Sequence, residues 1–243
     1  MHMLKPGNLC YIAGAFSDRG AIKKINQDKI CLRKKNMESG EAVLAVVCGG
    51  MGGMARGDVA ANTVVREFAI WFRNHIEEAL EDPKRIMKDW TAIIEELNER
   101  IWGYGKQKGI KLGTTLTVII FMPDGRYYTA NVGNNRIYRI EGNKIRQENE
   151  QPSGEKGKKS RIFMGCSDLV SPYFADGSIH TGESLLLCTD GFYHMLKKNP
   201  DKKLIENGYE KDDEIRKMLE EVIHDMTNYG EKDNISAIMI KAK

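Results

Sequence analysis

The separation of strand-type and helix-type patterns along the chain constrains the fold most. Short apolar runs typical of strands stand at both ends and in the second half, and two long stretches between them repeat apolar residues at helical spacing. Strands are expected at residues 11–16, 30–33, 42–48, 115–121, 127–132, 136–141, 144–147, 184–188 and 235–241. Helices are expected from Gly57 to about Ala79, onward from Pro83, and from Asp212 to about Asn228. Strand and helix do not alternate over the middle third, so we expect an α+β fold with helices packed on antiparallel sheet.

Turn sequences in the second half support antiparallel pairing. The segments Pro123-Asp124-Gly125, Gly133-Asn134-Asn135 and Gly142-Asn143 separate the expected strands, and such residues are typical of hairpin turns. They predict a meander. A polar segment from Glu148 to Lys159 is expected to be a loop.

Composition excludes several classes of protein. A chain of 243 residues without a linker favours one domain. Lys and Arg number 37 against 34 Asp and Glu, which disfavours nucleic-acid binding. Five scattered cysteines without CxxC spacing argue against a disulfide frame and structural zinc. No apolar run approaches the ~20 residues of a membrane span, and no signal pattern begins the chain. We therefore expect a cytoplasmic protein that binds neither nucleic acid nor membrane.

Acidic residues at the ends of two expected strands are candidate metal ligands. The run 185–188 leads into Thr189, Asp190 and Gly191, and Asp233-Asn234 precedes the strand that begins at Ile235. A carboxylate at the end of a buried strand is held rigidly, as Mg²⁺ or Mn²⁺ sites require. A single Asp-Gly is more often a turn, so these residues alone leave both interpretations open.

A series of short motifs runs along the chain in a fixed order. The motifs are Ser17-Asp18-Arg19-Gly20, Lys23, Asn26-Gln27-Asp28, Gly49-Gly50-Met51-Gly52-Gly53, Gly113-Thr114-Thr115-Leu116, Asn131-Val132-Gly133-Asn134-Asn135-Arg136, Cys188-Thr189-Asp190-Gly191 and Asp233-Asn234. In this order they resemble the motif series of the protein phosphatase 2C family of metal-dependent serine/threonine phosphatases. The resemblance covers about residues 11–241. It implies a single domain over 1–243, a four-layer α/β/β/α sandwich with two central antiparallel sheets, and a flap at about 148–180.

The resemblance also implies a mechanism and a partner class. Two Mg²⁺ or Mn²⁺ ions in a cleft at one edge of the sandwich, bridged by a carboxylate and a hydroxide, would orient the hydroxide for attack on a phosphoserine or phosphothreonine. An arginine would hold the phosphate. The expected partner is therefore a protein, phosphorylated on Ser or Thr.

Residue by residue, the resemblance carries over only part of this site. Asp28, Asp190 and Asp233 fall on metal-ligand positions, and Gly50 falls on the glycine whose carbonyl contributes a ligand. Gly49, however, falls where the family has its bridging aspartate.

Three further departures surround that position. Met54 stands at the histidine of the family motif, and a thioether is a poor ligand for a hard cation. Lys23 replaces the phosphate-binding arginine and offers a point charge in place of a two-pronged guanidinium. Asn134 replaces an aspartate associated with a third metal in bacterial members, so that ion is not expected.

Two hypotheses follow. The favoured one is a pseudophosphatase, a catalytically impaired or dead member that serves as a binding or regulatory module for a phosphoprotein. The alternative is an active phosphatase with a reduced or altered metal site, completed by another acid such as Asp58. In either case at most one Mg²⁺ or Mn²⁺ is expected, contacted by Asp190 and Asp233, and an ion-free site is the other outcome.

Two other patterns have ordinary explanations. Cys48 and Cys188 with Asp190 could recruit Zn²⁺, but such cysteines are more often small apolar fillers. The basic residues between Lys156 and Arg161 could meet an acidic partner, although a solvated loop is the more common outcome.

Overall fold

The computed structural model describes residues 8–51, 56–149, 163–198, 202–206 and 208–243. Ten strands form two sheets, each wholly antiparallel. The first has the order β1 (Tyr11–Asp18), β10 (Ile235–Ala242), β9 (Ser184–Cys188), β6 (Arg136–Glu141), β7 (Lys144–Gln147). The second has the order β2 (Lys29–Met37), β3 (Gly40–Cys48), β4 (Leu116–Phe121), β5 (Arg126–Val132), β8 (Tyr173–Ser178).

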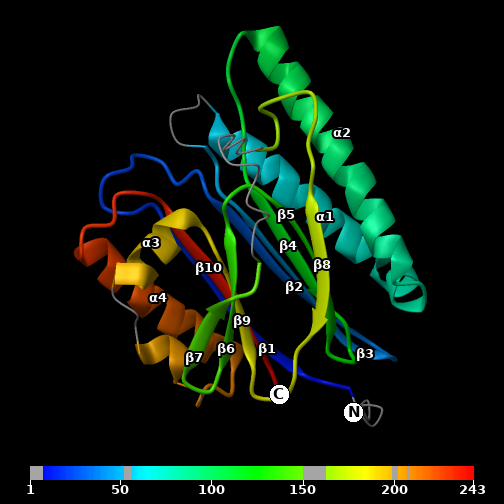
Figure 1. The fold of residues 1–243 in the computed structure, drawn as a ribbon, viewed down its shortest axis with the longest axis vertical. Helices are drawn as coiled ribbons and strands as arrows, with labels where there is room; N and C mark the ends of the chain where they lie inside the picture. The colour runs from blue at the N-terminus through cyan, green and yellow to red at the C-terminus, as the bar shows by residue number, and fades with distance from the viewer. Residues whose placement is uncertain (1–7, 52–55, 150–162, 199–201, 207) are drawn as a thin grey trace, which may run out of the picture.

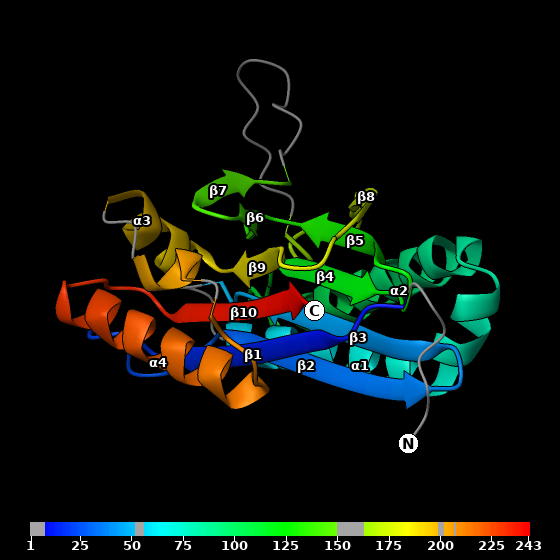
Figure 2. The ribbon, with the colours of Figure 1, turned by 90° about the horizontal axis from the view of Figure 1, so that it is seen from below.

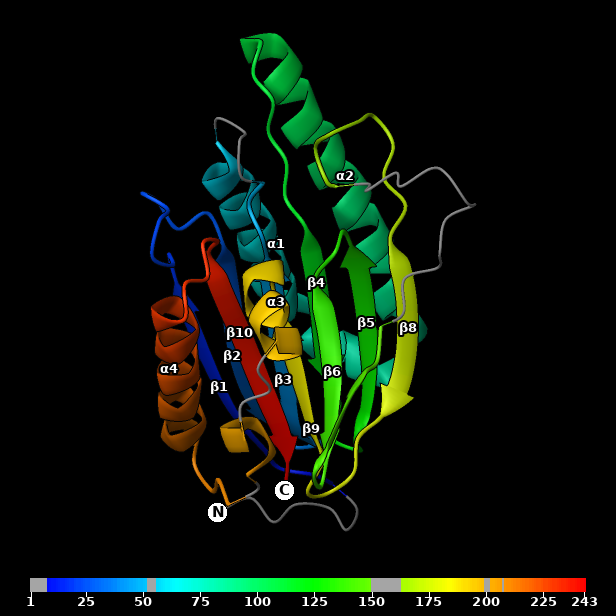
Figure 3. The same ribbon diagram turned by 60° about the vertical axis from the view of Figure 1, so that its left-hand side comes forward.

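The sheets lie face to face between two layers of helix (Figure 1, Figure 2). The helical elements are α1 (Gly57–Glu81), α2 (Lys84–Lys108), α3 (Asp190–Lys198), the short 3₁₀ helix η1 (Lys202–Ile205) and α4 (Asp212–Asn228). Helices α1 and α2 cover the β2–β8 sheet, while α3 and α4 cover the β1–β7 sheet (Figure 3). The predicted four-layer α/β/β/α sandwich is confirmed.

Three apolar clusters hold these layers together, one in each gap between layers. The cluster between α1, α2 and their sheet contains Phe68, Trp71 and Trp90, which meet edge to face. A second cluster lies under α3 and α4, and the third fills the space between the sheets. β3 is covered on both faces, so seven consecutive residues from Ala42 to Cys48 are fully buried, which explains its unbroken apolar sequence.

Strand β2 is longer than its sequence pattern predicted. The expected strand ended at Arg33, but β2 continues through a polar stretch to Met37. It is an edge strand, where polar side chains reach solvent, and an apolar pattern therefore underestimates its length.

Three elements were not predicted: β8, α3 and η1. No residue of β8 is fully buried, and its sequence reads without apolar alternation, although backbone bonds to β5 fix it as a strand within the expected flap. Helix α3 begins at Asp190-Gly191, a pair that suggested a turn. The loop predicted from Glu148 to Lys159 lies, from position 150 onward, outside the described residues. Among those described, no helix is both long and apolar enough to span a bilayer.

Gly14 lets α4 pack directly on the backbone of β1. A Cβ atom at this position would lie 2.4 Å from the Arg216 amide nitrogen and 2.8 Å from the Ile215 carbonyl carbon. The contact needs a residue without a side chain.

We predict that Gly14→Ala destabilises the protein by about 1–3 kcal/mol, because α4 must move away from β1. Gly103→Ala is the matched control, since Gly103 lies in α2 with nothing within 4 Å of its added Cβ. It should stabilise the fold by about 0.5–1 kcal/mol. Urea unfolding measures both, and equal effects of the two substitutions would contradict this packing.

Candidate metal and phosphate site

The predicted site residues lie where both sheets end on the same side of the sandwich. Asp28 directly precedes β2 and Gly49 directly follows β3, and these strands pair so that the two residues share one end. Asp190 follows Thr189 at the end of β9, and Asp233 lies just before β10, the strand that pairs with β9. The antiparallel register therefore brings four distant segments together.

Asp28 is the buried member of this group. Its side chain is 6% exposed, and its Oδ2 accepts hydrogen bonds from Thr189 Oγ1 at 2.9 Å and Ser236 Oγ at 2.8 Å. Burial raises the pKa of Asp28 to about 7, against the lowering effect of the two hydroxyl bonds, and the charges of Asp190 and Asp233 add to the rise. This carboxylate joins the start of β2 in one sheet to β9 and β10 in the other.

Asp190 is the first residue of α3 and is also bonded within the protein. Its Oδ1 accepts the Gly191 amide at 3.1 Å, and its Oδ2 accepts a hydrogen bond from Asn134 Nδ2 at 3.2 Å. Gly191 is required for this turn, because an added Cβ would lie 2.2 Å from the Asn234 carbonyl oxygen. Asn134, which replaces an aspartate of the family motif, thus contacts the predicted metal ligand Asp190 directly.

Asp233 forms an ion pair with Lys23, the residue that stands at the position of the family's phosphate-binding arginine. Lys23 Nζ lies 2.9 Å from Asp233 Oδ1, with side-chain exposures of 36% and 43%. Glu231 Oε1 accepts the amides of Lys232 and Asp233 and so shapes the loop before β10. An exposed pair of this kind contributes little stability, so Lys23 can leave Asp233 at small cost.

Gly49 lies beside Asp28 and has room for a side chain. A Cβ atom at position 49 would stand 3.5 Å from Asp28 Oδ1 and 3.2 Å from Thr115 Oγ1, ordinary to slightly tight contacts. The backbone at Gly49 does not have the positive φ that favours glycine. Neither the backbone nor the space around it therefore demands glycine here.

Gly50 differs sharply from its neighbour. A Cβ atom there would lie 2.5 Å from the Gln27 carbonyl oxygen and 2.7 Å from the Gly57 carbonyl carbon. Its amide donates to the same Gln27 oxygen at 3.2 Å. Gly50 is therefore a structural requirement of the loop.

The side chains at this end of the sandwich include donors suited to a hard cation. Asp190 and Asp233 offer the carboxylate oxygens that Mg²⁺ and Mn²⁺ prefer. Over the described ranges, no three or more His, Cys, Asp or Glu side chains gather as a metal-binding group. The bridging position at Gly49 supplies no oxygen from a side chain. The residues at this end of the sandwich therefore include carboxylates suited to a hard cation but no side chain at the position that would bridge two of them.

The packing explains the cysteines Cys48 and Cys188 without a Zn²⁺ site. Cys48 and Cys188 are both fully buried and belong to the apolar clusters under opposite helix layers. Burial raises the pKa of both thiols well above the usual range, which disfavours the thiolates that zinc requires. Met54 and the basic segment at 156–161 lie outside the described residues.

Sequence reasoning missed the residues that hold the site together. Thr189 and Ser236 orient Asp28, and Asn234 Oδ1 accepts the Gln27 amide at 3.0 Å. Asn234 Nδ2 also donates to the carbonyl oxygens of Arg19 and Ile25, at 2.8 and 3.1 Å. Asn234 therefore fastens the loop between β1 and β2 to the start of β10. Thr189 and Asn234 stand in recognised motifs, which was the available signal, whereas Ser236 looked like an ordinary strand residue.

Comparison with known proteins decides the family. The family model for protein phosphatase 2C matches residues 21–239. The chain belongs to the protein phosphatase 2C family. The resemblance stated from the motifs is thereby confirmed.

Curated relatives within the protein phosphatase 2C family span nearly the whole chain. The serine/threonine phosphatase stp of Listeria welshimeri is 26% identical, over 93% of this chain and 93% of its own. Protein phosphatase PhpP of Streptococcus pneumoniae is 22% identical, over 92% and 94%.

Solved structures agree on the fold. Stp1 from Staphylococcus aureus matches with a TM-score of 0.76 at 22% identity, covering 100% of this chain and 98% of that one. The catalytic domain of PstP, solved in complex with two manganese ions, matches with a TM-score of 0.74 at 20% identity, covering 96% and 99%. At these identities the similarity establishes the shared architecture.

We predict that neighbouring glycines respond oppositely to alanine. Gly49→Ala should change the free energy of unfolding by less than about 1 kcal/mol, because its Cβ meets one tight contact, Thr115 Oγ1 at 3.2 Å, and a shift of a few tenths of an ångström relieves it. Gly50→Ala should cost about 2–3 kcal/mol, since backbone atoms block its Cβ. Chemical denaturation of both variants measures the difference. A large loss of stability in Gly49→Ala would mean that glycine at 49 is required by the fold.

Proposed function

We propose that this phosphatase 2C family member is a pseudophosphatase, which binds a protein phosphorylated on Ser or Thr and hydrolyses the phosphate very slowly or not at all. The observation that carries the proposal is the glycine at position 49. Its backbone lies beside Asp28: a Cβ atom at position 49 would stand 3.5 Å from Asp28 Oδ1, so a side chain there would be a direct neighbour of that carboxylate.

The other departures act on the remaining candidate ligands. The ammonium of Lys23 pairs with Asp233, and the amide of Asn134 donates to Asp190. Both aspartates thus have hydrogen-bond donors from the protein itself, and a metal ion must compete with them. Two of the altered residues thus each contact one retained aspartate.

The role of a metal follows from this arrangement. Asp190 and Asp233 would hold at most one Mg²⁺ or Mn²⁺, which would attract and polarise a phosphate oxygen. Lys23 would add a point charge for the same phosphate once released from Asp233. The chain's own residues therefore bind and orient a phosphate. Without a bridging carboxylate, a nucleophile displaced by even ~1 Å would lose about a hundredfold in rate.

We predict that the natural protein turns over para-nitrophenyl phosphate with Mn²⁺ no faster than an Asp190→Ala control. The missing bridge removes the group that positions the attacking oxygen. Steady-state assays of both proteins, purified side by side, measure this. Robust Mn²⁺-dependent turnover that disappears in Asp190→Ala would instead support the active phosphatase with an altered site.

Restoring the family residues tests the same point from the opposite direction. Gly49→Asp combined with Lys23→Arg, Asn134→Asp and Met54→His should gain at least about a hundredfold in turnover, because all four departures are reversed. Gly49→Asp alone should gain less. No gain in the fourfold variant, with its fold intact by circular dichroism, would show that activity was lost for another reason.

Lys23 is expected to compete with a metal ion for Asp233. Lys23→Met should bind Mn²⁺ about three- to tenfold more tightly than the natural protein, because a positive charge leaves Asp233. Lys24→Met, in the same loop and exposed, is the matched control and should leave the affinity unchanged. Isothermal titration calorimetry compares the three. Equal affinities for both variants would contradict a direct role of the Lys23–Asp233 pair.

A further inference from the structure

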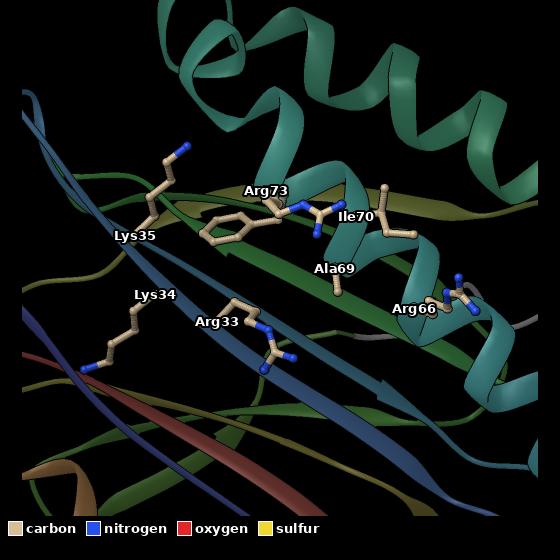
Figure 4. Close-up of a pocket in the computed structure, with 8 residues that line it drawn as sticks. Arg33, Lys34, Lys35, Arg66, Ala69, Ile70 and Arg73 are labelled. Carbon is tan, nitrogen blue, oxygen red and sulfur yellow. The ribbon is translucent and has the colours of Figure 1, made fainter.

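A basic hollow lies between strand β2 and helix α1 (Figure 4). Its volume is about 310 Å³, at the lower end of the range of small-ligand pockets. Three apolar residues of α1 line it, Ala69, Ile70 and Phe72. The arginines that line it are Arg33 from β2 and Arg66 and Arg73 from α1.

The periodicities of strand and helix place these side chains together. On β2, Arg33 and Lys35 share the face of Cys31, which packs in the cluster under α1. On α1, Arg66 is followed by Ala69, Ile70 and Arg73, which lie three, four and seven positions along and form one stripe. The hollow is therefore built by regular elements on both sides.

The two lysines at the hollow are already paired. Lys34 Nζ contacts Asp212 Oδ1 at 2.7 Å and the Tyr11 carbonyl oxygen at 2.6 Å, and its ammonium points away from the arginines (Figure 4). Lys35 Nζ lies 2.8 Å from Glu77 Oε1. The charge of each lysine is therefore partly offset by a carboxylate.

The three arginines differ in this respect. Within the described part of the chain, no Asp or Glu oxygen lies within 4.0 Å of the guanidinium nitrogens of Arg33, Arg66 or Arg73. Arg33 donates to the Leu32 carbonyl and Arg73 to the Asn74 amide oxygen, both neutral acceptors. The hollow thus carries an excess of positive charge in the form of guanidinium groups, which suit phosphate oxygens.

Protection of an exposed sheet edge explains only part of this arrangement. β2 is an edge strand, and edge strands often carry cations that prevent pairing with another chain. That need accounts for Arg33, Lys34 and Lys35. It does not require Arg66 and Arg73 on the facing helix, nor a hollow with an apolar lining.

We propose that this hollow binds a phosphate group on a serine or threonine of a polypeptide segment. A phosphorylated side chain brings a charge of about −1.5 to −2 and three acceptor oxygens, which matches several guanidinium groups. The apolar residues accommodate the aliphatic part of a neighbouring side chain. The site goes beyond the cleft but rests on the proposed function for its partner class.

The position of β2 favours a peptide over a free nucleotide. β2 begins directly after Asp28, and Arg33 lies five residues further, so about 17 Å separates the cleft end of the strand from the hollow. An extended segment of about five residues spans that distance. The outer edge of β2 also offers the backbone groups along which such a segment can lie.

Nuclear magnetic resonance of the arginine Nε–Hε groups tests the proposal. The probes are an Ala/Gly-rich peptide with one phosphoserine, the same peptide without phosphate, a longer peptide with two phosphoserines about five residues apart, inorganic phosphate and adenosine monophosphate. We expect the phosphopeptides to shift the signals of Arg33, Arg66 and Arg73, and the unphosphorylated peptide to leave them in place.

Paired variants assign the binding to the hollow. Arg66→Gln with Arg73→Gln should weaken binding of the doubly phosphorylated peptide at least about tenfold. Lys88→Gln with Lys108→Gln removes the same charge from exposed positions of α2 and should change it less than about twofold. Equal losses in both double variants would mean a general charge effect and would overturn the proposal.

The remaining measurements distinguish phosphate binding at the hollow from binding at the cleft, and a peptide ligand from a small-molecule ligand. In Lys23→Ala, the singly phosphorylated peptide should still shift the three arginine signals, whether or not the cleft binds phosphate. Absence of those shifts in the natural protein overturns the hollow and leaves the cleft untouched. Phosphate or adenosine monophosphate binding as tightly as the phosphopeptide would identify a small-molecule site and overturn the peptide assignment.

Discussion

The buried carboxylate of Asp28 is the interaction on which the site depends. It accepts hydroxyl bonds from Thr189 and Ser236, and these residues belong to the sheet opposite to the one that Asp28 begins. A buried charge is costly unless it is hydrogen-bonded, so the two sheets must keep this register at the cleft. Asn234 reinforces it by binding the loop that leads to Asp28. The scaffold of the site therefore stands without the bridging carboxylate.

Much of the fold could be predicted because local patterns and tertiary demands agree. β3 is apolar from Ala42 to Cys48, and β4 is apolar apart from Thr117, because both faces of these strands are covered; α1 and α2 show the stripe that packs on their sheet. β8 and α3 could not be predicted, since β8 is fixed by pairing with β5 and α3 opens with a pair that also suits a turn. Long-range pairing leaves little trace in a local sequence window.

The candidate site, too, could be predicted only in part from the sequence. The structure places Asp28, Gly49, Asp190 and Asp233, the residues that motif order singled out, at one end of the sandwich. It did not reveal that the departures contact the retained residues, because a bond such as Lys23 to Asp233 joins residues far apart in sequence. The sequence also could not show that Gly49 and Gly50 differ in the space around their Cα atoms, because that space depends on the folded structure. Gly50 is required by backbone contacts, whereas the nearest neighbours of a Cβ atom at Gly49 are side-chain atoms, Asp28 Oδ1 among them.

The central claim is that the chain cannot assemble a bridged pair of metal ions. Its most direct test is the anomalous scattering of manganese in crystals of the natural protein and of Gly49→Asp, soaked in the same Mn²⁺ concentration. The account predicts at most one ion in the natural protein, bound by Asp190 and Asp233, and an additional ion adjacent to Asp28 only where position 49 carries a carboxylate. Two closely spaced ions in the natural protein would contradict it.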